Sequence, residues 1–150
     1  AFDAQGHKKR MGEILMELGV LDEEQLKSIL KAQSEEPQLR LGTLVVEHGF
    51  TGEEIIAKIL AAQLRLPFQD IAGTEIAAGV IGAVSPHVTR LHRCMPLAKD
   101  DGVLTVAMVN PLDLIAIEDL ELASQCQVAP VVSTATQIEA RLQEFYGDTD

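Results

Sequence analysis

Arginine, glycine and glutamine recur at matching places in two neighbouring segments of the chain. Arg10 to Gln33 reads RMGEILMELGVLDEEQLKSILKAQ, and Arg40 to Gln63 reads RLGTLVVEHGFTGEEIIAKILAAQ. Aligned without gaps at an offset of 30, these segments share ten identical residues of 24. The planar guanidinium of arginine forms paired hydrogen bonds with phosphate oxygens or with the edge of a guanine. The repeat therefore predicts a pseudo-symmetric site for a ligand that is itself two-fold and anionic.

Each copy of the repeat predicts a short helix, a glycine stop and a longer helix. Gly19 and Gly49 stand where a left-handed helix end favours glycine. The longer helices are predicted to begin at Asp22 and at Thr51, each followed three positions later by Gln or Glu as a capping partner. Residues at three- and four-residue spacing then share one helix face: Leu26, Ile29, Leu30 and Gln33 in the first copy, and Ile56, Ile59, Leu60 and Gln63 in the second.

The pattern changes after residue 65 to short segments that alternate between strand and helix. Pro67 is expected to end the last helix of the repeat, and no assignment is made for residues 71–83. The expected strands are Phe68–Ile71, a hairpin over Cys94–Val109, and Val128–Val132, where Pro130 indicates a sheet edge. The expected helices are Ser85–His92, Asn110–Ser124 and Thr134–Tyr146. We predict an α+β protein, with a four-helix unit of two tandem helix pairs in 1–65 and a small α/β sandwich-like subdomain in 66–150.

Charge is distributed unevenly between these two halves. The net charge of the chain is −11, with aromatic residues at only 3%. Residues 1–65 contain eight Lys/Arg and eleven Asp/Glu, a net of −3, whereas residues 66–150 contain four and twelve, a net of −8. A DNA or RNA surface requires clustered cations or stacking aromatics, so neither partner is expected. The cations that can meet an anion lie mainly in the first half.

Several signals for other functions are missing from the sequence. The histidines have no metal-ligand spacing, and no carboxylate pair suggests acid–base catalysis, so we expect no metal, no cofactor and no catalytic residue. GxxxxGK[ST] does not occur, so ATPase activity is expected only in a missing C-terminal part of a longer parent chain. Cys94 and Cys126 are expected to be reduced thiols, with a disulfide as the weaker alternative.

Residue types by themselves leave two interpretations of the repeat open. One is a duplicated packing unit, in which the leucines and isoleucines form the core and the Arg and Gln side chains are solvated or capping. The other is a ligand site, because core packing does not require Arg-x-Gly at the start and Gln at the end of both copies.

The repeat resembles the tandem motif RLGxxΦΦxxGΦΦxxxxLxxxLxxQ, in which Φ is aliphatic, of the MshEN family. Later segments, including LPFQDI and PLAKDDGVLTVAMVNPLD, are also similar to that family, so the resemblance covers roughly residues 8–147. MshEN domains form the N-terminal part of type II secretion and type IV pilus assembly ATPases. The resemblance implies binding of cyclic di-GMP by residues 1–65 and a regulatory rather than enzymatic role. The implied binding residues are Arg10, Met11, Gly12, Leu26, Leu30, Gln33, Arg40, Leu41, Gly42, Ile56, Leu60 and Gln63.

The resemblance also implies partners and a location. The expected partners are the C-terminal ATPase domain of the same chain and the inner-membrane platform protein of the secretion or pilus machine. This places the protein in the cytoplasm, at the periphery of the inner membrane. Lys8 and Lys9 are expected to add positive charge, whereas a contact from Asn110 is in doubt, since the family often has Asp there. The alternative function is a docking domain that links the ATPase to the platform without nucleotide, through the acidic residues 66–150.

Overall fold

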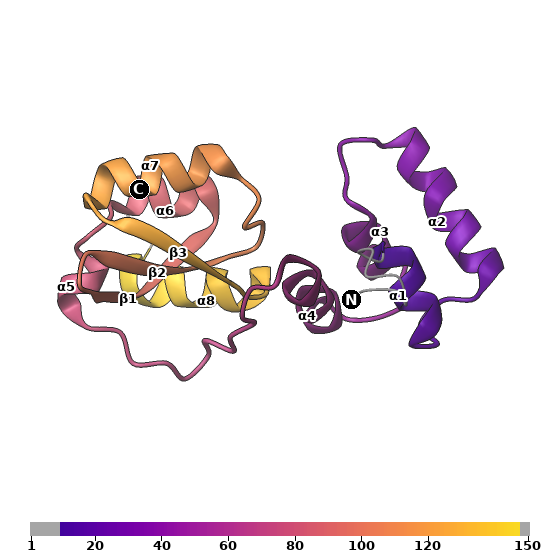
Figure 1. Ribbon diagram of the computed structural model, residues 1–150, viewed down its shortest axis with the longest axis horizontal. Coiled ribbons are helices and arrows are strands. Elements are labelled where there is room, and N and C mark those ends of the chain that lie inside the picture. Colours follow the sequence, from indigo (N-terminus) through magenta and orange to yellow (C-terminus); the bar gives the residue numbers. More distant parts are fainter. Residues whose placement is uncertain (1–9, 148–150) are drawn as a thin grey trace. The chain divides into compact units, whose positions relative to one another are not determined.

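The computed structural model describes residues 10–147 and has a mixed α+β fold, as expected from the sequence. Lys8 and Lys9 lie outside the described residues. Within them there are eight helices and one three-stranded sheet. The chain divides between Arg65 and Leu66 into two compact units, called here the helical unit and the sheet unit (Figure 1). No helix in the described part is both long enough and apolar enough to cross a membrane.

The helical unit consists of two helix pairs. Its helices are α1 (Met11–Glu17), α2 (Glu23–Glu35), α3 (Leu41–Glu47) and α4 (Glu53–Leu64). The short helices α1 and α3 end at Gly19 and Gly49, with φ of +77° and +78°, as predicted, because residues with a Cβ rarely adopt that conformation. Asp22 caps α2 through the predicted reciprocal bonds with Gln25, of 2.8 and 2.9 Å.

The predicted start of α4 is wrong by one residue. The N-cap is Gly52 and not Thr51, and no side chain caps this end of the helix. Gly52 is the residue that aligns with Asp22 in the first copy of the repeat. The two long helices therefore begin at the same point of the repeat, and this common geometry prevails over the modest capping preference of threonine.

An aliphatic core holds the helical unit together. Side chains from all four helices and the turns between them are buried in it: Leu15, Leu21, Ile29, Leu44, Val45 and Ile59. Leu15 and Val45 belong to the short helices, whereas Ile29 and Ile59 occupy equivalent positions on the long ones. Burying each such side chain is worth roughly 1.5–3 kcal/mol. The short helices, of only seven residues, depend on this packing, since isolated helices of that length are unstable in water.

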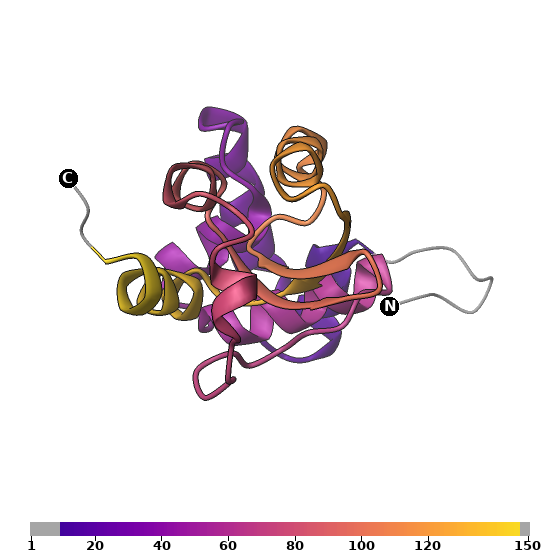
Figure 2. The same ribbon diagram turned by 90° about the vertical axis from the view of Figure 1, so that its left-hand side faces the viewer.

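The sheet unit is a three-layer sandwich. Its elements are α5 (Ala78–Ile81), α6 (Pro86–His92), β1 (Cys94–Asp100), β2 (Val103–Met108), α7 (Leu114–Ser124), β3 (Gln127–Val132) and α8 (Ala135–Tyr146). The strand order is β1-β2-β3, with β1 antiparallel and β3 parallel to β2. Asp101 and Gly102, both with positive φ, form the two-residue turn of the β1–β2 hairpin. Figure 2 shows α6 and α7 on one side of the sheet and α8 on the other.

Alternate residues of the strands supply the two cores of this sandwich. Cys94, Leu104 and Val106 face one core, together with Ala116 and Leu120 of α7. The second core contains Ile71, Met95, Leu97, Ala107, Val131 and three residues of α8: Ile138, Leu142 and Tyr146. Cys94 and Cys126 are both buried and free, in agreement with the expectation of reduced thiols.

The expected strand at Phe68–Ile71 is reduced to a single bridge between Phe68 and Val132. Gln69 N–H donates to the Val132 carbonyl (2.9 Å), but the chain then turns away, because the Asp70 carboxylate accepts a hydrogen bond from Ala72 N–H. The short helix α5 occupies part of the segment that had no assignment. The edge position of β3, expected from Pro130, is confirmed.

Two buried acids should make the sheet unit sensitive to alkaline pH. Burial raises the pKa of the Cys94 thiol to about 12, and burial together with the nearby Cys94 raises the pKa of Tyr146 to about 12. In the unfolded chain these groups ionise near their ordinary values of 9.0 and 10.0. Their contribution to stability is therefore complete below pH 9 and is lost progressively as the pH rises from about 9 to about 12.

We expect the free energy of unfolding, measured by urea titration with circular dichroism, to fall above about pH 9. Cys94 should contribute a slope of at most about 1.4 kcal/mol per pH unit. The variant Cys94→Ala should be less stable at pH 8 but should lose less stability between pH 8 and pH 10.5. An equal loss in both proteins would show that Cys94 does not ionise on unfolding.

Candidate functional site

The first turns of α1 and α3 contact each other in a reciprocal arrangement. The Met11 sulfur lies 3.1 Å from the position that a Cβ would take on Gly42, and a methyl carbon of Leu41 lies 3.7 Å from the corresponding position on Gly12. Residue 11 thus meets residue 42, and residue 41 meets residue 12. Each pairing is the equivalent of the other under the 30-residue offset, so the helical unit has local two-fold pseudo-symmetry at this point.

The same two glycines are also where each long helix approaches its short partner. A Cβ on Gly12 would lie 2.9 Å from Leu26 Cδ1 of α2, and one on Gly42 would lie 2.5 Å from Ile56 Cγ2 of α4. Both glycines are buried. Their lack of a side chain is therefore required by helix packing, whether or not a ligand also approaches the backbone.

Arg10 and Arg40 stand immediately before this contact, as the N-caps of α1 and α3. Their backbone conformations are nearly identical, with φ and ψ of −74° and 152° for Arg10 and −77° and 153° for Arg40. Both side chains are exposed. Within residues 10–147 neither guanidinium makes a hydrogen bond or an ion pair, although the chain has 23 carboxylates and only 12 Lys/Arg. Two cations are thus held at equivalent positions of one pseudo-symmetric surface.

The electrostatic environment differs between the two arginines. Glu13 lies in the first turn of α1, where its carboxylate accepts a hydrogen bond from Arg10 N–H (3.5 Å). Thr43 takes the equivalent place in α3, whose first turn has no acidic residue. Although Arg40 as a residue is exposed, its guanidinium is partly desolvated by neighbouring groups, which lowers its pKa; it stays charged at physiological pH. The first turn beside Arg40 therefore lacks the negative charge that lies beside Arg10.

The apolar residues predicted for the site divide into two groups. Leu26 and Ile56 are half-buried and pack against the core, so they serve the glycine contacts already described. Leu30 is 48% exposed, and its equivalent Leu60 is half-buried. Within these four positions, Leu30 has the most apolar surface left for a ligand.

The two predicted glutamines lie in the last turns of α2 and α4, and both are half-buried. The Gln33 amide donates to the Leu39 carbonyl (3.4 Å), which links the end of α2 to the residue before Arg40. Gln33 therefore positions the segment that leads into Arg40.

Two hollows in the structure contain none of the predicted residues. One, of about 210 Å³, lies between α1 and α4 and is lined by Ile14, Leu18, Ile55, Lys58, Ile59 and Ala62. The other, of about 610 Å³ and open to solvent, lies beside α8 in the sheet unit. No cluster of three or more His, Cys, Asp or Glu side chains among the described residues is arranged to hold a metal ion. The two arginines of the predicted site are exposed on the surface of the helical unit and line neither hollow.

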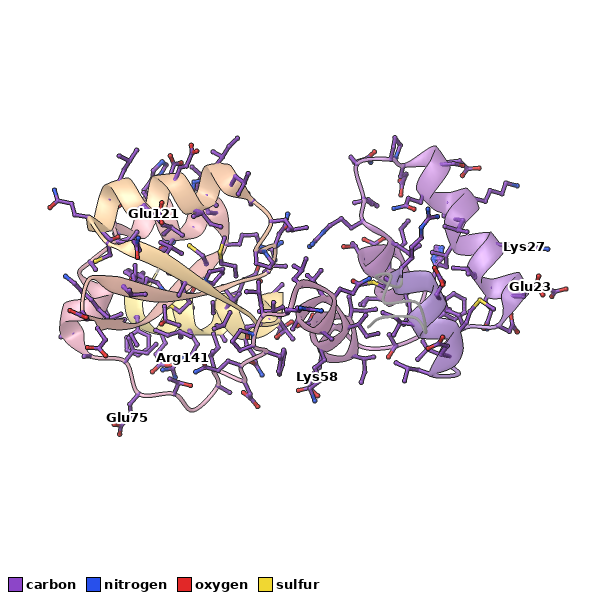
Figure 3. The ribbon with its side chains drawn as sticks, viewed as in Figure 1. Glu23, Lys27, Lys58, Glu75, Glu121 and Arg141 are labelled. Atoms are coloured by element: carbon purple, nitrogen blue, oxygen red, sulfur yellow. The ribbon has the colours of Figure 1, made fainter. Side chains whose placement is uncertain are left out.

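Arg141 is a residue with several strong contacts that sequence reasoning missed. It lies buried at the edge of the larger hollow, where its guanidinium donates to the carbonyls of Ala72 and Thr74 and contacts the ring of Phe145 at 4.8 Å (Figure 3). These bonds fix the loop between Ile71 and α5. One sequence feature indicates this role: Arg141 lies three residues after Ile138, so it is on the core-facing side of α8, where a charged residue needs partners.

Comparisons with known proteins identify similar sequences and structures. A family model, the MshEN domain, matches residues 64–150, which is the sheet unit and the end of α4. A search among curated proteins finds no match. The MshE structure with cdg is similar to this chain with a TM-score of 0.79 and 28% sequence identity, over 92% of this chain and 99% of that one.

The N-terminal domain of XpsE has the same fold in two crystal structures. One has a TM-score of 0.71 and the other of 0.59, each at 22% identity. The first covers 93% of this chain and the second 97%, and both cover 99% of the XpsE domain. The family-model match does not include the tandem repeat, so the repeat's relation to known proteins rests on the structural similarity to MshE.

The contacts at Gly12 and Gly42 predict that replacing each glycine with alanine destabilises the helical unit to a different degree. Gly42→Ala should lower the free energy of unfolding by about 1–2 kcal/mol, because overpacking against Ile56 costs about 1–3 kcal/mol and alanine's helix propensity restores up to about 1. Gly12→Ala should cost less, since its nearest neighbour is the flexible end of Leu26. Gly79→Ala in α5, with nothing within 4 Å, is the control and should leave stability unchanged or raise it by up to about 1 kcal/mol. Urea unfolding measures all three, and equal stability of Gly42→Ala and Gly79→Ala would contradict the packing role.

Proposed function

The chain belongs to the MshEN domain family, and on that premise we propose that its helical unit binds cyclic di-GMP. The observation that carries the proposal is the pair of guanidinium groups of Arg10 and Arg40. They have matching backbone conformations, flank a reciprocal helix contact, and have no hydrogen-bond or ion-pair partner among residues 10–147. In an acidic protein, two such cations at one surface favour an external anion as their partner.

The chemistry of cyclic di-GMP fits this arrangement. The ligand has two phosphates and two guanines related by a two-fold axis, and the helical unit has a two-fold pseudo-symmetric surface with one arginine on each side. Arginine forms two parallel hydrogen bonds either with phosphate oxygens or with O6 and N7 of guanine. The MshE structure, which is 28% identical to this chain, contains cdg, and this adds support.

Leu30 and Leu60 provide apolar surface for the flat faces of the bases. They occupy equivalent positions on the long helices, and Leu30 is the more exposed. Gln33 and Gln63, three residues further along, brace the site in this proposal, Gln33 through the Leu39 carbonyl that precedes Arg40. Arg40 has no acidic neighbour in its helix turn, so we expect it to contribute at least as much to binding as Arg10.

Binding of this kind makes the domain a sensor for a motor. We infer that the parent protein is an assembly ATPase of a type II secretion or type IV pilus machine, located in the cytoplasm at the inner membrane. Ligand binding then biases the ATPase domain of the same chain. The energetic requirement is that the ligand binds one state of the assembled motor more tightly than another.

A second candidate function is protein docking through the sheet unit, with the inner-membrane platform protein as the partner. The specific observation in its favour is the exposure of four large apolar side chains on α7 and just before it, in a unit with a net charge of −8. This function requires no nucleotide, and both functions can operate in one chain.

Isothermal titration calorimetry with cyclic di-GMP tests the main proposal. We expect Arg40→Ala to weaken binding about ten-fold or more, because a hydrogen bond to a charged group is worth about 1.5–3 kcal/mol. Arg10→Ala should weaken it by a similar or smaller factor. Arg40→Lys should restore only part of the affinity, since an ammonium group keeps the charge but not the planar fork.

Lys27→Ala provides a matched control for loss of one positive charge. Lys27 is exposed on α2 and extends away from the helical unit in Figure 3. Its replacement should leave the dissociation constant within about two-fold. No heat from the unmodified chain at high ligand concentration, or equal losses in Lys27→Ala and Arg40→Ala, would contradict the proposed site.

A further inference from the structure

Large apolar side chains are exposed on α7 and just before it. Leu112, Leu114, Ile115 and Leu122 each have between 61% and 79% of their surface exposed. Single exposed leucines are common on soluble proteins, but a group of them on one helix marks an interaction site.

Three of these side chains share one face of the helix. At 100° per residue, Ile115 and Leu122 lie about 100° and 80° around the axis from Leu114, and the group extends about 12 Å along it. Glu118 lies between Leu114 and Leu122 on the same side and is exposed. We call these four residues the α7 face. The opposite side of the helix, which contains Ala116 and Leu120, is fully buried against the sheet.

The helix that presents this face is held rigidly. Asp113 caps its N-terminus by accepting a hydrogen bond from Ala116 N–H (3.1 Å). His92 of α6 bonds to Asp119 (2.8 Å), and the Glu121 carboxylate accepts from Val128 N–H of β3 (3.0 Å; Glu121 is labelled in Figure 3). A preformed apolar face binds a partner without the entropic cost of ordering a flexible segment.

The charge around the α7 face restricts what can cover it. The sheet unit has twelve Asp/Glu and four Lys/Arg, and two of those four, Arg93 and Arg141, are paired with Glu139 and Glu144. A second copy of this chain, with its own net charge of −11, would bring like charges together. An anionic membrane surface would be repelled for the same reason. A cationic protein surface is attracted, and apolar side chains at helical spacing match the shape of the face.

We propose that the α7 face is a docking site for a basic amphipathic helix of a partner protein. Apolar residues of that helix, three or four positions apart, would pack on Leu114, Ile115 and Leu122, and a flanking Lys or Arg would pair with Glu118. The proposal deepens the docking function and is independent of nucleotide binding by the helical unit.

Fluorescence anisotropy with a labelled model peptide tests the proposal. The probe is a Leu/Lys peptide of about 18 residues with leucine at three- and four-residue spacing, long enough to form a helix on binding. The 150-residue chain should bind it, and the double variant Ile115→Ser/Leu122→Ser should bind it at least about ten-fold more weakly. Both side chains are exposed, so circular dichroism should show an unchanged fold and melting temperature. Glu118→Gln should also weaken binding, whereas Glu24→Gln on α2 should not.

The matched control removes exposed apolar groups elsewhere. Met16→Ser/Leu18→Ser changes two exposed residues of the helical unit and should leave peptide affinity unchanged. A peptide with Glu in place of Lys should not bind. Equal binding by the Ile115→Ser/Leu122→Ser variant would overturn the proposal. So would a dimer in sedimentation equilibrium that this variant dissolves, or binding to phosphatidylglycerol vesicles that this variant abolishes.

A cyclic di-GMP titration of the same double variant separates this proposal from the nucleotide site, because affinity for the nucleotide should be unaffected. A pull-down with the cytoplasmic domain of the platform protein separates it from docking in general. Retention of the platform domain by the double variant at wild-type level would leave the docking function standing and would show that the α7 face is not the surface used.

Discussion

The helical unit depends on the close approach of helices at Gly12 and Gly42. Each glycine accommodates a side chain from its own long helix and another from the other copy of the repeat. Because these contacts are reciprocal, they place the first turns of α1 and α3 together and put Arg10 and Arg40 at equivalent backbone positions. A methyl group at Gly42 would overlap Ile56, and one at Gly12 would force the end of Leu26 to move, so the packing of the core and the geometry of the surface cations are coupled.

The two units of the chain differ in how they bury apolar surface and in how they pair their charged side chains. The helical unit has short helices that gain their stability from a shared aliphatic core, and it leaves two arginines without partners among the described residues. The sheet unit buries both faces of a small sheet and pairs its few cations internally, as with Arg141 and Arg93. Its outer surface is therefore strongly acidic. This division of charge is the basis of both proposals, an anionic ligand for the helical unit and a basic protein partner for the sheet unit.

Local signals in the sequence predicted most helices and strands. They failed where contacts between residues far apart in the chain determine the conformation. Gly19, Gly49 and Asp22 act through neighbouring backbone, so their roles were predictable. Thr51 was chosen as a cap on its residue type, yet the repeat geometry places the cap at Gly52. The strand at Phe68 was overestimated because Asp70 turns the chain away from β3. Nothing in the composition of residues 71–83 indicated that Arg141, far along the chain, holds that segment.

The sequence by itself determined the tandem repeat, the α+β class and the identity of the polar residues that recur, since these follow from periodicity and from residue types at fixed spacing. It left open whether the repeat as a whole was a ligand site or a duplicated packing unit. Only the tertiary structure showed that Gly12 meets Leu26, that Gly42 meets Ile56, and that each also meets a residue of the other copy, about 30 positions away along the chain. The exposure of Leu114, Ile115 and Leu122 was likewise decided by tertiary structure, since burial depends on which face of α7 meets the sheet.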